Sequence, residues 1–195
     1  MKIIEFDSHK VALLPIGEGS VEALTPTDIA HIDSISSSSR KAEQIAWRTA
    51  LRALTGTKSD IVYLPSGAPI LTNTAQHISV SHNTKWAAVA IGNTKCGIDI
   101  ELLARNFERI ATRYISPEEA QLPESAHPLF KPLLWSAKEA IYKYVATEGV
   151  DFTEDIRIVA TDIVAKKLKA EFRGESLPTI HFQTIDSDSI LTFIG

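Results

Sequence analysis

Short runs of alternating apolar and polar residues occur in both halves of the chain, and they predict β-strands. KIIEF (residues 2–6) and KVALLPI (10–16) predict two opening strands, and IVYLPSGAPIL (61–71) predicts a strand and a turn. HISVSH (77–82) and KWAAVAI (85–91) flank a short break, so we expect them to form a hairpin.

Helical periodicity is clearest in RKAEQIAWRTALRALTG (40–56), where apolar residues recur on one face and Gly56 predicts the end of the helix. A short helix at 28–35 and a serine cluster at 36–39 come before it. The opposite face carries Lys41, Arg48 and Arg52. Taken by itself, this face is more typical of solvated charges than of an anion site.

Two more helices are expected in the second half, at 102–115 and 127–146, with Ser116 as a helix N-cap between them. The remaining tail, from residue 155 onward, is a series of alternating strands with polar turns. Helices followed by strands therefore occur twice along the chain. This order favours an α+β fold over a parallel sheet built from βαβ units.

Two carboxylates lie close together in KCGIDIEL (95–102), which predicts the next strand. Because strand side chains alternate between faces, Ile98 and Ile100 point one way and Asp99 and Glu101 the other. Two solvated acids on a half-exposed strand would explain this pattern. The functional alternative needs a cation, and Mg²⁺ takes oxygen ligands from one or two carboxylates.

A second candidate is WSAKEAIYK (135–143), which brings Trp135, Glu139 and Lys143 onto neighbouring turns of one helix. Glu139 precedes Lys143 by four residues, so a surface ion pair beside a core tryptophan is the simpler explanation of this segment alone.

The third candidate is the strand end ISVSHN, with Ser81, His82 and, just beyond, Lys85. Consecutive strand side chains point to opposite faces, so Ser81 and His82 are poorly suited to act as nucleophile and base. A hydroxyl, an imidazole and a lysine at a strand end suit phosphate binding better.

The composition of the chain argues against several classes of protein. The chain has 195 residues, a net charge of −4 and one cysteine, so a general nucleic-acid binder is disfavoured and an intramolecular disulfide is excluded. The N-terminus MKIIEFDSHK lacks the apolar run of a signal peptide, and WAAVAI (86–91) is too short to span a bilayer. A cytoplasmic protein without membrane contact is expected.

Together the three segments carry a family resemblance. Ser81–His82, GIDIE (97–101) and WSAKEAIYK (135–143), in this order, resemble the signature of the 4′-phosphopantetheinyl transferase superfamily. The similarity extends to RKAEQIAWRTALR, YISPEE and GVDFTEDIRI. The length resembles the long, two-lobed form of the family, the surfactin-synthetase-activating type. That form implies two similar α+β lobes, here 1–96 and 97–195, that make a monomeric pseudo-dimer.

The resemblance implies transfer of the phosphopantetheine arm of coenzyme A to a serine of an apo acyl or peptidyl carrier protein. Adenosine 3′,5′-bisphosphate is released. Such carriers serve fatty-acid, polyketide and nonribosomal-peptide synthesis. The implied roles fall into three groups. Asp99, Glu101 and Glu139 would hold Mg²⁺ or Mn²⁺, Glu139 and Lys143 would be catalytic, and coenzyme A would contact Arg40, Arg48, Ser81, His82, Lys85 and Lys143.

Some choices stay open. Either Arg40 or Arg48 would bind the 3′-phosphate or its neighbourhood. Many long-form members carry a lysine where this chain has Ala68, and residues 11–39 contain no lysine or arginine, so fewer cations are expected around that phosphate. The alternatives to a transferase are a metal-dependent pyrophosphate hydrolase and a non-catalytic relative that binds coenzyme A or a carrier.

Overall fold

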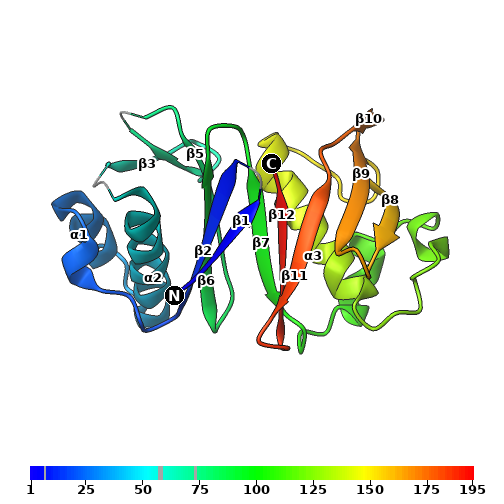
Figure 1. The fold of residues 1–195 in the computed structure, drawn as a ribbon, viewed down its shortest axis with the longest axis horizontal. Helices are drawn as coiled ribbons and strands as arrows, with labels where there is room; N and C mark the ends of the chain where they lie inside the picture. Colours follow the sequence, from blue (N-terminus) through cyan, green and yellow to red (C-terminus); the bar gives the residue numbers. More distant parts are fainter. Residues whose placement is uncertain (7, 57–58, 73) are drawn as a thin grey trace. The chain divides into compact units, whose positions relative to one another are not determined.

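The computed structural model describes residues 1–6, 8–56, 59–72 and 74–195 (Figure 1). This part of the chain divides into two compact units, Met1–Cys96 and Gly97–Gly195. Both units combine an antiparallel sheet with packed helices, which confirms the predicted α+β class. Among the described helices, none is both long enough and apolar enough to cross a membrane.

The unit Met1–Cys96 is built on a four-stranded antiparallel sheet with the order β1-β2-β6-β5. Its strands are β1 (Lys2–Phe6), β2 (His9–Pro15), β5 (His77–His82) and β6 (Trp86–Gly92). A separate hairpin is formed by β3 (Ile61–Tyr63) and β4 (Pro69–Leu71). The helices are η1 (Val21–Ala23), α1 (Pro26–Asp33) and α2 (Ser38–Thr55). The pairing of β5 with β6 confirms the expected hairpin.

Helix α2 ends before Gly56, as predicted, but begins at Ser38, two residues earlier than expected and within the serine cluster. The side chain of Ser37 accepts a hydrogen bond from the backbone N–H of Arg40, and Gly56 ends the helix at φ 63°. Its apolar face packs on β2 and β6, where Trp47 and Leu51 join a core with Ala12 and Val89. This burial of an amphipathic face is the main source of the helix's stability.

The opposite face of α2 differs from the prediction of solvated charges. Arg48 and Arg52 are buried, and both pair with the buried Asp28 of α1 at 3.0 and 2.8 Å. Burial alone would raise the pKa of Asp28, but hydrogen bonds from Arg52 and Thr25 hold it below its usual value. The guanidinium of Arg48 also donates to the hydroxyl of Tyr63 at 2.8 Å. The two arginines therefore join α1 to α2 inside the unit.

The unit Gly97–Gly195 contains a six-stranded sheet with the order β10-β9-β11-β12-β7, and β8 pairs with β9. Its strands are β7 (Gly97–Leu102), β8 (Ile156–Asp162), β9 (Lys167–Phe172), β10 (Glu175–Ser176), β11 (Ile180–Ile185) and β12 (Ser189–Ile194). Its helices are η2 (Glu108–Arg113), η3 (Glu119–Gln121) and α3 (Phe130–Val145).

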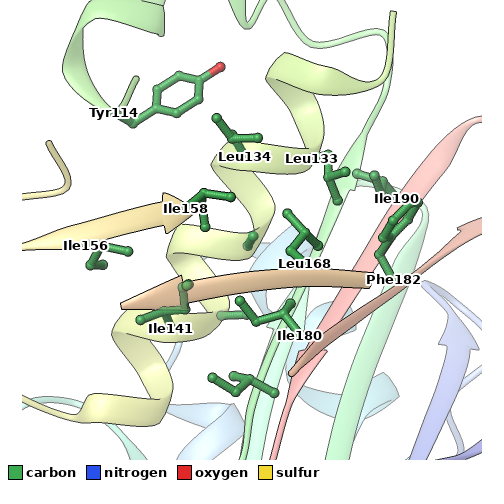
Figure 2. Close-up of a cluster of buried hydrophobic side chains, with 14 of the residues drawn as sticks. Tyr114, Leu133, Leu134, Ile141, Ile156, Ile158, Leu168, Ile180, Phe182 and Ile190 are labelled. Carbon is green, nitrogen blue, oxygen red and sulfur yellow. The ribbon is translucent and has the colours of Figure 1, made fainter. Parts of the chain in front are cut away.

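Helix α3 lies against this sheet, and its apolar face and the strands together form the core of the unit. Figure 2 shows Leu133, Leu134 and Ile141 of the helix meeting apolar side chains from β8, β9, β11 and β12. The cluster continues to Tyr114, which is buried beside the start of the helix and donates its hydroxyl to the carbonyl of Lys131 at 3.0 Å. The helix is thereby fixed on the same sheet that carries β7.

The prediction of a helix at 102–115 is wrong. Leu102 still belongs to β7, and only the short 3-10 helix η2 forms within the range. The N-cap position of η2 is Phe107, and the side chain of Asn106, one residue earlier, accepts a hydrogen bond from the backbone N–H of Arg109 at 3.2 Å. The helix expected at 127–146 is confirmed in its type and shortened to α3.

Candidate functional site

Strand β7 presents two acids to the face of the sheet that carries α3. Ile98 and Ile100 are buried on the opposite face, as the alternation predicted. Asp99 pairs in register with Thr192 of β12, whose hydroxyl donates to the carbonyl of Ser136 in α3 at 2.8 Å. Asp99 is only 5% exposed, so the interpretation of two solvated acids is wrong for this residue.

The ammonium of Lys143 joins α3 to β7. Its Nζ lies 3.0 Å from Oδ1 of Asp99 and donates to the carbonyl of Ile98 at 2.9 Å. Strand and helix are thus connected by a partly buried ion pair. The structure therefore brings together two of the residues that the sequence singled out from separate segments.

Glu101 is held by an aromatic residue and a cation. The indole Nε1–H of Trp135 donates to Oε1 of Glu101 at 2.7 Å, and Nη1 of Arg105 forms an ion pair with the same oxygen. The guanidinium of Arg105 lies over the Trp135 ring, 4.8 Å from its centroid. Glu101 is consequently oriented by α3 on one side and by its own following turn on the other.

Glu139 of α3 completes the acidic group. Burial raises its pKa to about 6, with the charges of Asp99 and Glu101 adding to the effect and Lys143 opposing it. Burial also raises the pKa of Glu101, again reinforced by Asp99. The three carboxylates are therefore close enough to repel one another, although they come from a strand and a helix about forty residues apart.

These residues suit a divalent cation by their chemistry. All three side chains offer carboxylate oxygens, which Mg²⁺ and Mn²⁺ prefer, and their mutual repulsion would be relieved by positive charge. Within the described residues, however, no group of three or more His, Cys, Asp or Glu side chains is already arranged to hold a metal ion. Positive charge at the group comes instead from Lys143 and Arg105.

Gly97 allows the strand and the helix to come this close. A Cβ at this position would lie 2.0 Å from the carbonyl oxygen of Ala140 and 2.9 Å from the backbone nitrogen of Tyr144. Both contacts are to the backbone of α3, which cannot yield as a side-chain tip could. A glycine here is thus required for Asp99 and Glu139 to share one site.

The other candidates belong to the unit Met1–Cys96. Ser81 is buried and His82 is exposed, in agreement with opposite faces of β5. Nε2 of His82 lies 3.5 Å from a carboxylate oxygen of Glu43. Lys85 lies in the turn before β6, where the side chain of Asn83 accepts its backbone N–H at 2.8 Å.

The two candidate arginines differ in accessibility. Arg40 is exposed in the first turn of α2, where its side chain can reach a ligand. Arg48 is 1% exposed and binds Asp28, Tyr63 and Gln44. Of the two, Arg40 is the one whose guanidinium is available at the surface.

The sequence patterns did not predict the roles of two residues in the unit Gly97–Gly195, Arg105 and Lys138. Arg105 follows Glu101 by four residues, a spacing that could have suggested their pairing. Lys138, within WSAKE, is fully buried and bound to Glu119 of η3. Its position among apolar residues on the inner face of α3 was the available sign.

Comparison with known proteins agrees with this geometry. The family model for the 4′-phosphopantetheinyl transferase superfamily matches residues 95–193, more than half of the chain. A search of curated protein sequences finds no match. The matched range contains β7, α3 and the whole acidic group. The chain therefore belongs to the 4′-phosphopantetheinyl transferase superfamily.

Proposed function

We propose that this protein transfers the 4′-phosphopantetheine arm of coenzyme A to a serine hydroxyl of an apo acyl or peptidyl carrier protein. The serine oxygen bonds to the phosphorus that bears the pantetheine arm. The bond from that phosphorus to the bridging pyrophosphate oxygen breaks, and adenosine 3′,5′-bisphosphate leaves. The observation that carries the proposal is the meeting of Asp99, Glu101, Glu139 and Lys143 within the region matched by the family.

Each of these residues has a chemical role in the proposal. Glu139 accepts the proton of the serine hydroxyl, and its pKa of about 6 lies near the pH at which such a base works well. Lys143 stabilises negative charge on the phosphate oxygens as the bond to the leaving group breaks. The carboxylates of Asp99, Glu101 and Glu139 would hold Mg²⁺ or Mn²⁺, which supplies charge neutralisation at the pyrophosphate.

The unit Met1–Cys96 contributes the remaining contacts to coenzyme A in this proposal. Ser81, His82 and Lys85, at the end of β5 and in the turn after it, are assigned to phosphate oxygens. Arg40 is assigned to the 3′-phosphate because it is exposed. Arg48 contributes through the fold, since its guanidinium is buried against Asp28.

The transferase proposal is tested with coenzyme A, Mg²⁺ and apo carrier proteins of the fatty-acid, polyketide and peptide-synthetase types. Mass spectrometry should detect the phosphopantetheine increment on at least one of them. No increment on any carrier would contradict the proposal. Nucleotide release from coenzyme A without a carrier would favour the pyrophosphate hydrolase, and coenzyme A binding without either reaction would favour the non-catalytic relative.

The assignment of Arg40 leads to a binding prediction. Arg40→Ala should weaken coenzyme A binding about three- to ten-fold, because one charge-assisted hydrogen bond to phosphate is lost. It should leave 3′-dephospho-coenzyme A binding almost unchanged, and titration calorimetry with both ligands measures the difference. Lys41→Ala removes a neighbouring charge and is the matched control. Equal weakening for both ligands would remove Arg40 from the 3′-phosphate site.

A further inference from the structure

We propose that Arg105 is a built-in counter-cation that competes with the divalent metal ion for Glu101 and so sets the affinity of the metal site. The inference rests on the metal site of the proposed function and adds to it a residue that acts through Glu101. Arg105 is thus a positioning residue. It lies in the turn that follows β7, four residues after the carboxylate that it binds.

The contacts of Glu101 explain the competition. Oε1 of Glu101 accepts two hydrogen bonds, one from the indole N–H of Trp135 at 2.7 Å and one from Nη1 of Arg105. The guanidinium also lies over two rings, 4.8 Å from the centroid of Trp135 and 5.5 Å from that of Phe107. Arg105 therefore has a defined resting position in which it neutralises one of the proposed metal ligands.

Arg105 and Lys143 are not equivalent as cations of the group. The side chain of Lys143 is 26% exposed, and its ammonium is bound both to the buried Asp99 and to the carbonyl of Ile98. The side chain of Arg105 is 41% exposed, and no backbone carbonyl is among its hydrogen-bond acceptors within the described residues. Arg105 is therefore the more accessible of the two cations, whereas Lys143 is held by a backbone carbonyl as well as by a buried carboxylate.

The net charge of the acidic group and its two cations also indicates Arg105 as the residue that competes with the metal ion. Ionised Asp99, Glu101 and Glu139 with Lys143 and Arg105 leave one net negative charge, so the group is nearly neutral as it stands. A divalent cation would make it positive as long as Arg105 stayed in place. Withdrawal of the guanidinium brings the group back to neutrality, so metal binding and the Arg105–Glu101 pair oppose each other.

The test measures Mn²⁺ binding alone, without coenzyme A or carrier, by electron paramagnetic resonance of free Mn²⁺. Arg105→Gln should bind Mn²⁺ about three- to ten-fold more tightly than the wild-type protein, because a like charge beside the metal is removed. Arg105→Lys keeps the charge but loses the planar guanidinium that lies over Trp135 and Phe107, so its Mn²⁺ affinity should fall between those of Arg105→Gln and the wild-type protein. Arg109→Gln removes an exposed charge from the same segment and should stay within about two-fold of wild type.

The outcomes separate this inference from the function on which it rests. Unchanged or weaker Mn²⁺ binding by Arg105→Gln overturns the role of Arg105, provided that Asp99→Asn abolishes binding in the wild-type background. Absence of Asp99-dependent Mn²⁺ binding overturns both the metal site and the role of Arg105. Tighter binding by Arg105→Gln together with a failed carrier assay supports the counter-cation and contradicts only the transferase proposal.

Discussion

Glu139→Gln is expected to lower transfer to a carrier protein by about a thousand-fold and to leave the fold intact. In the proposed mechanism the amide could not accept the serine proton, and it would replace a charged oxygen ligand of the metal ion by a neutral one. Loss of a general base or of one electrostatic group at a phosphoryl centre commonly costs about 10²–10⁴-fold. The rate of carrier modification, followed by mass spectrometry at saturating coenzyme A, measures the effect.

A measurement of the free energy of unfolding distinguishes this loss of transfer activity from a loss caused by misfolding. The pKa of Glu139 is raised from 4.5 to about 6 in the fold, so its ionised form is disfavoured there relative to the unfolded chain. At pH 7.5, with a chelator present, Glu139→Gln should therefore be at least as resistant to urea as the wild-type protein. The advantage should vanish below pH 4.5, where the wild-type carboxyl is protonated in both states.

Glu148→Gln provides the matched control for Glu139→Gln. Glu148 is exposed in the loop after α3, so the same chemical change should alter the transfer rate less than two-fold. A Glu139→Gln protein that retains a tenth or more of the wild-type rate would show that Glu139 is neither base nor essential ligand. Equal losses in the two variants would point to an effect of net charge.

Much of the site could be predicted because its residues lie in segments with strong local patterns. The alternation in GIDIEL placed Ile98 and Ile100 on one face and the two acids on the other, as β7 has them. The helical period of WSAKEAIYK placed Glu139 and Lys143 together on α3. Only the family resemblance, however, indicated that this strand and this helix belong together.

The errors concern charged residues whose partners are distant in sequence. Arg48 and Arg52 follow Asp28 by 20 and 24 residues, so their burial could not be read from the polar face of α2 alone. The range 102–115 has helical composition, but its first part continues β7, and the guanidinium of Arg105 lies over the rings of Phe107 and Trp135. In α2 the helix itself was predicted and only the burial of its charged face was not, whereas in 102–115 local propensity for helix was overridden.

A second prediction with a large effect concerns the buried ion pair behind the site. Nζ of Lys138 lies 2.7 and 2.8 Å from the two carboxylate oxygens of Glu119. It also donates to the carbonyls of Phe152 and Ile156, at 2.7 and 2.9 Å. The carboxylate of Glu119 in turn accepts the backbone N–H groups of Ser116 and Ile158. Ser116, the expected N-cap, is part of this network: its hydroxyl accepts the backbone N–H of Glu119, while the N-cap position of the short helix η3 is Glu118.

Because every polar group in this network has a partner, removal of one charge should be costly. Lys138→Met should lower the free energy of unfolding by about 3–5 kcal/mol, since Glu119 would stay buried without its counter-charge. Urea unfolding followed by circular dichroism measures the change. Lys131→Met is the matched control, because the Lys131–Glu108 pair is exposed and should contribute less than about 1 kcal/mol.

The double variant Glu119→Gln/Lys138→Met decides whether the cost arises from an unpaired charge. The introduced amide keeps one acceptor oxygen for the backbone and carries no charge, so the double variant should be more stable than the sum of the single losses predicts. A coupling energy near zero would mean that Lys138 acts by filling space alone. Lys138 and Glu139 are adjacent on α3, yet one points into the core and the other toward the carboxylates of β7. The pair with Glu119 therefore anchors the helix from behind, and loss of that anchor should reduce transfer without removing any group that touches the substrate.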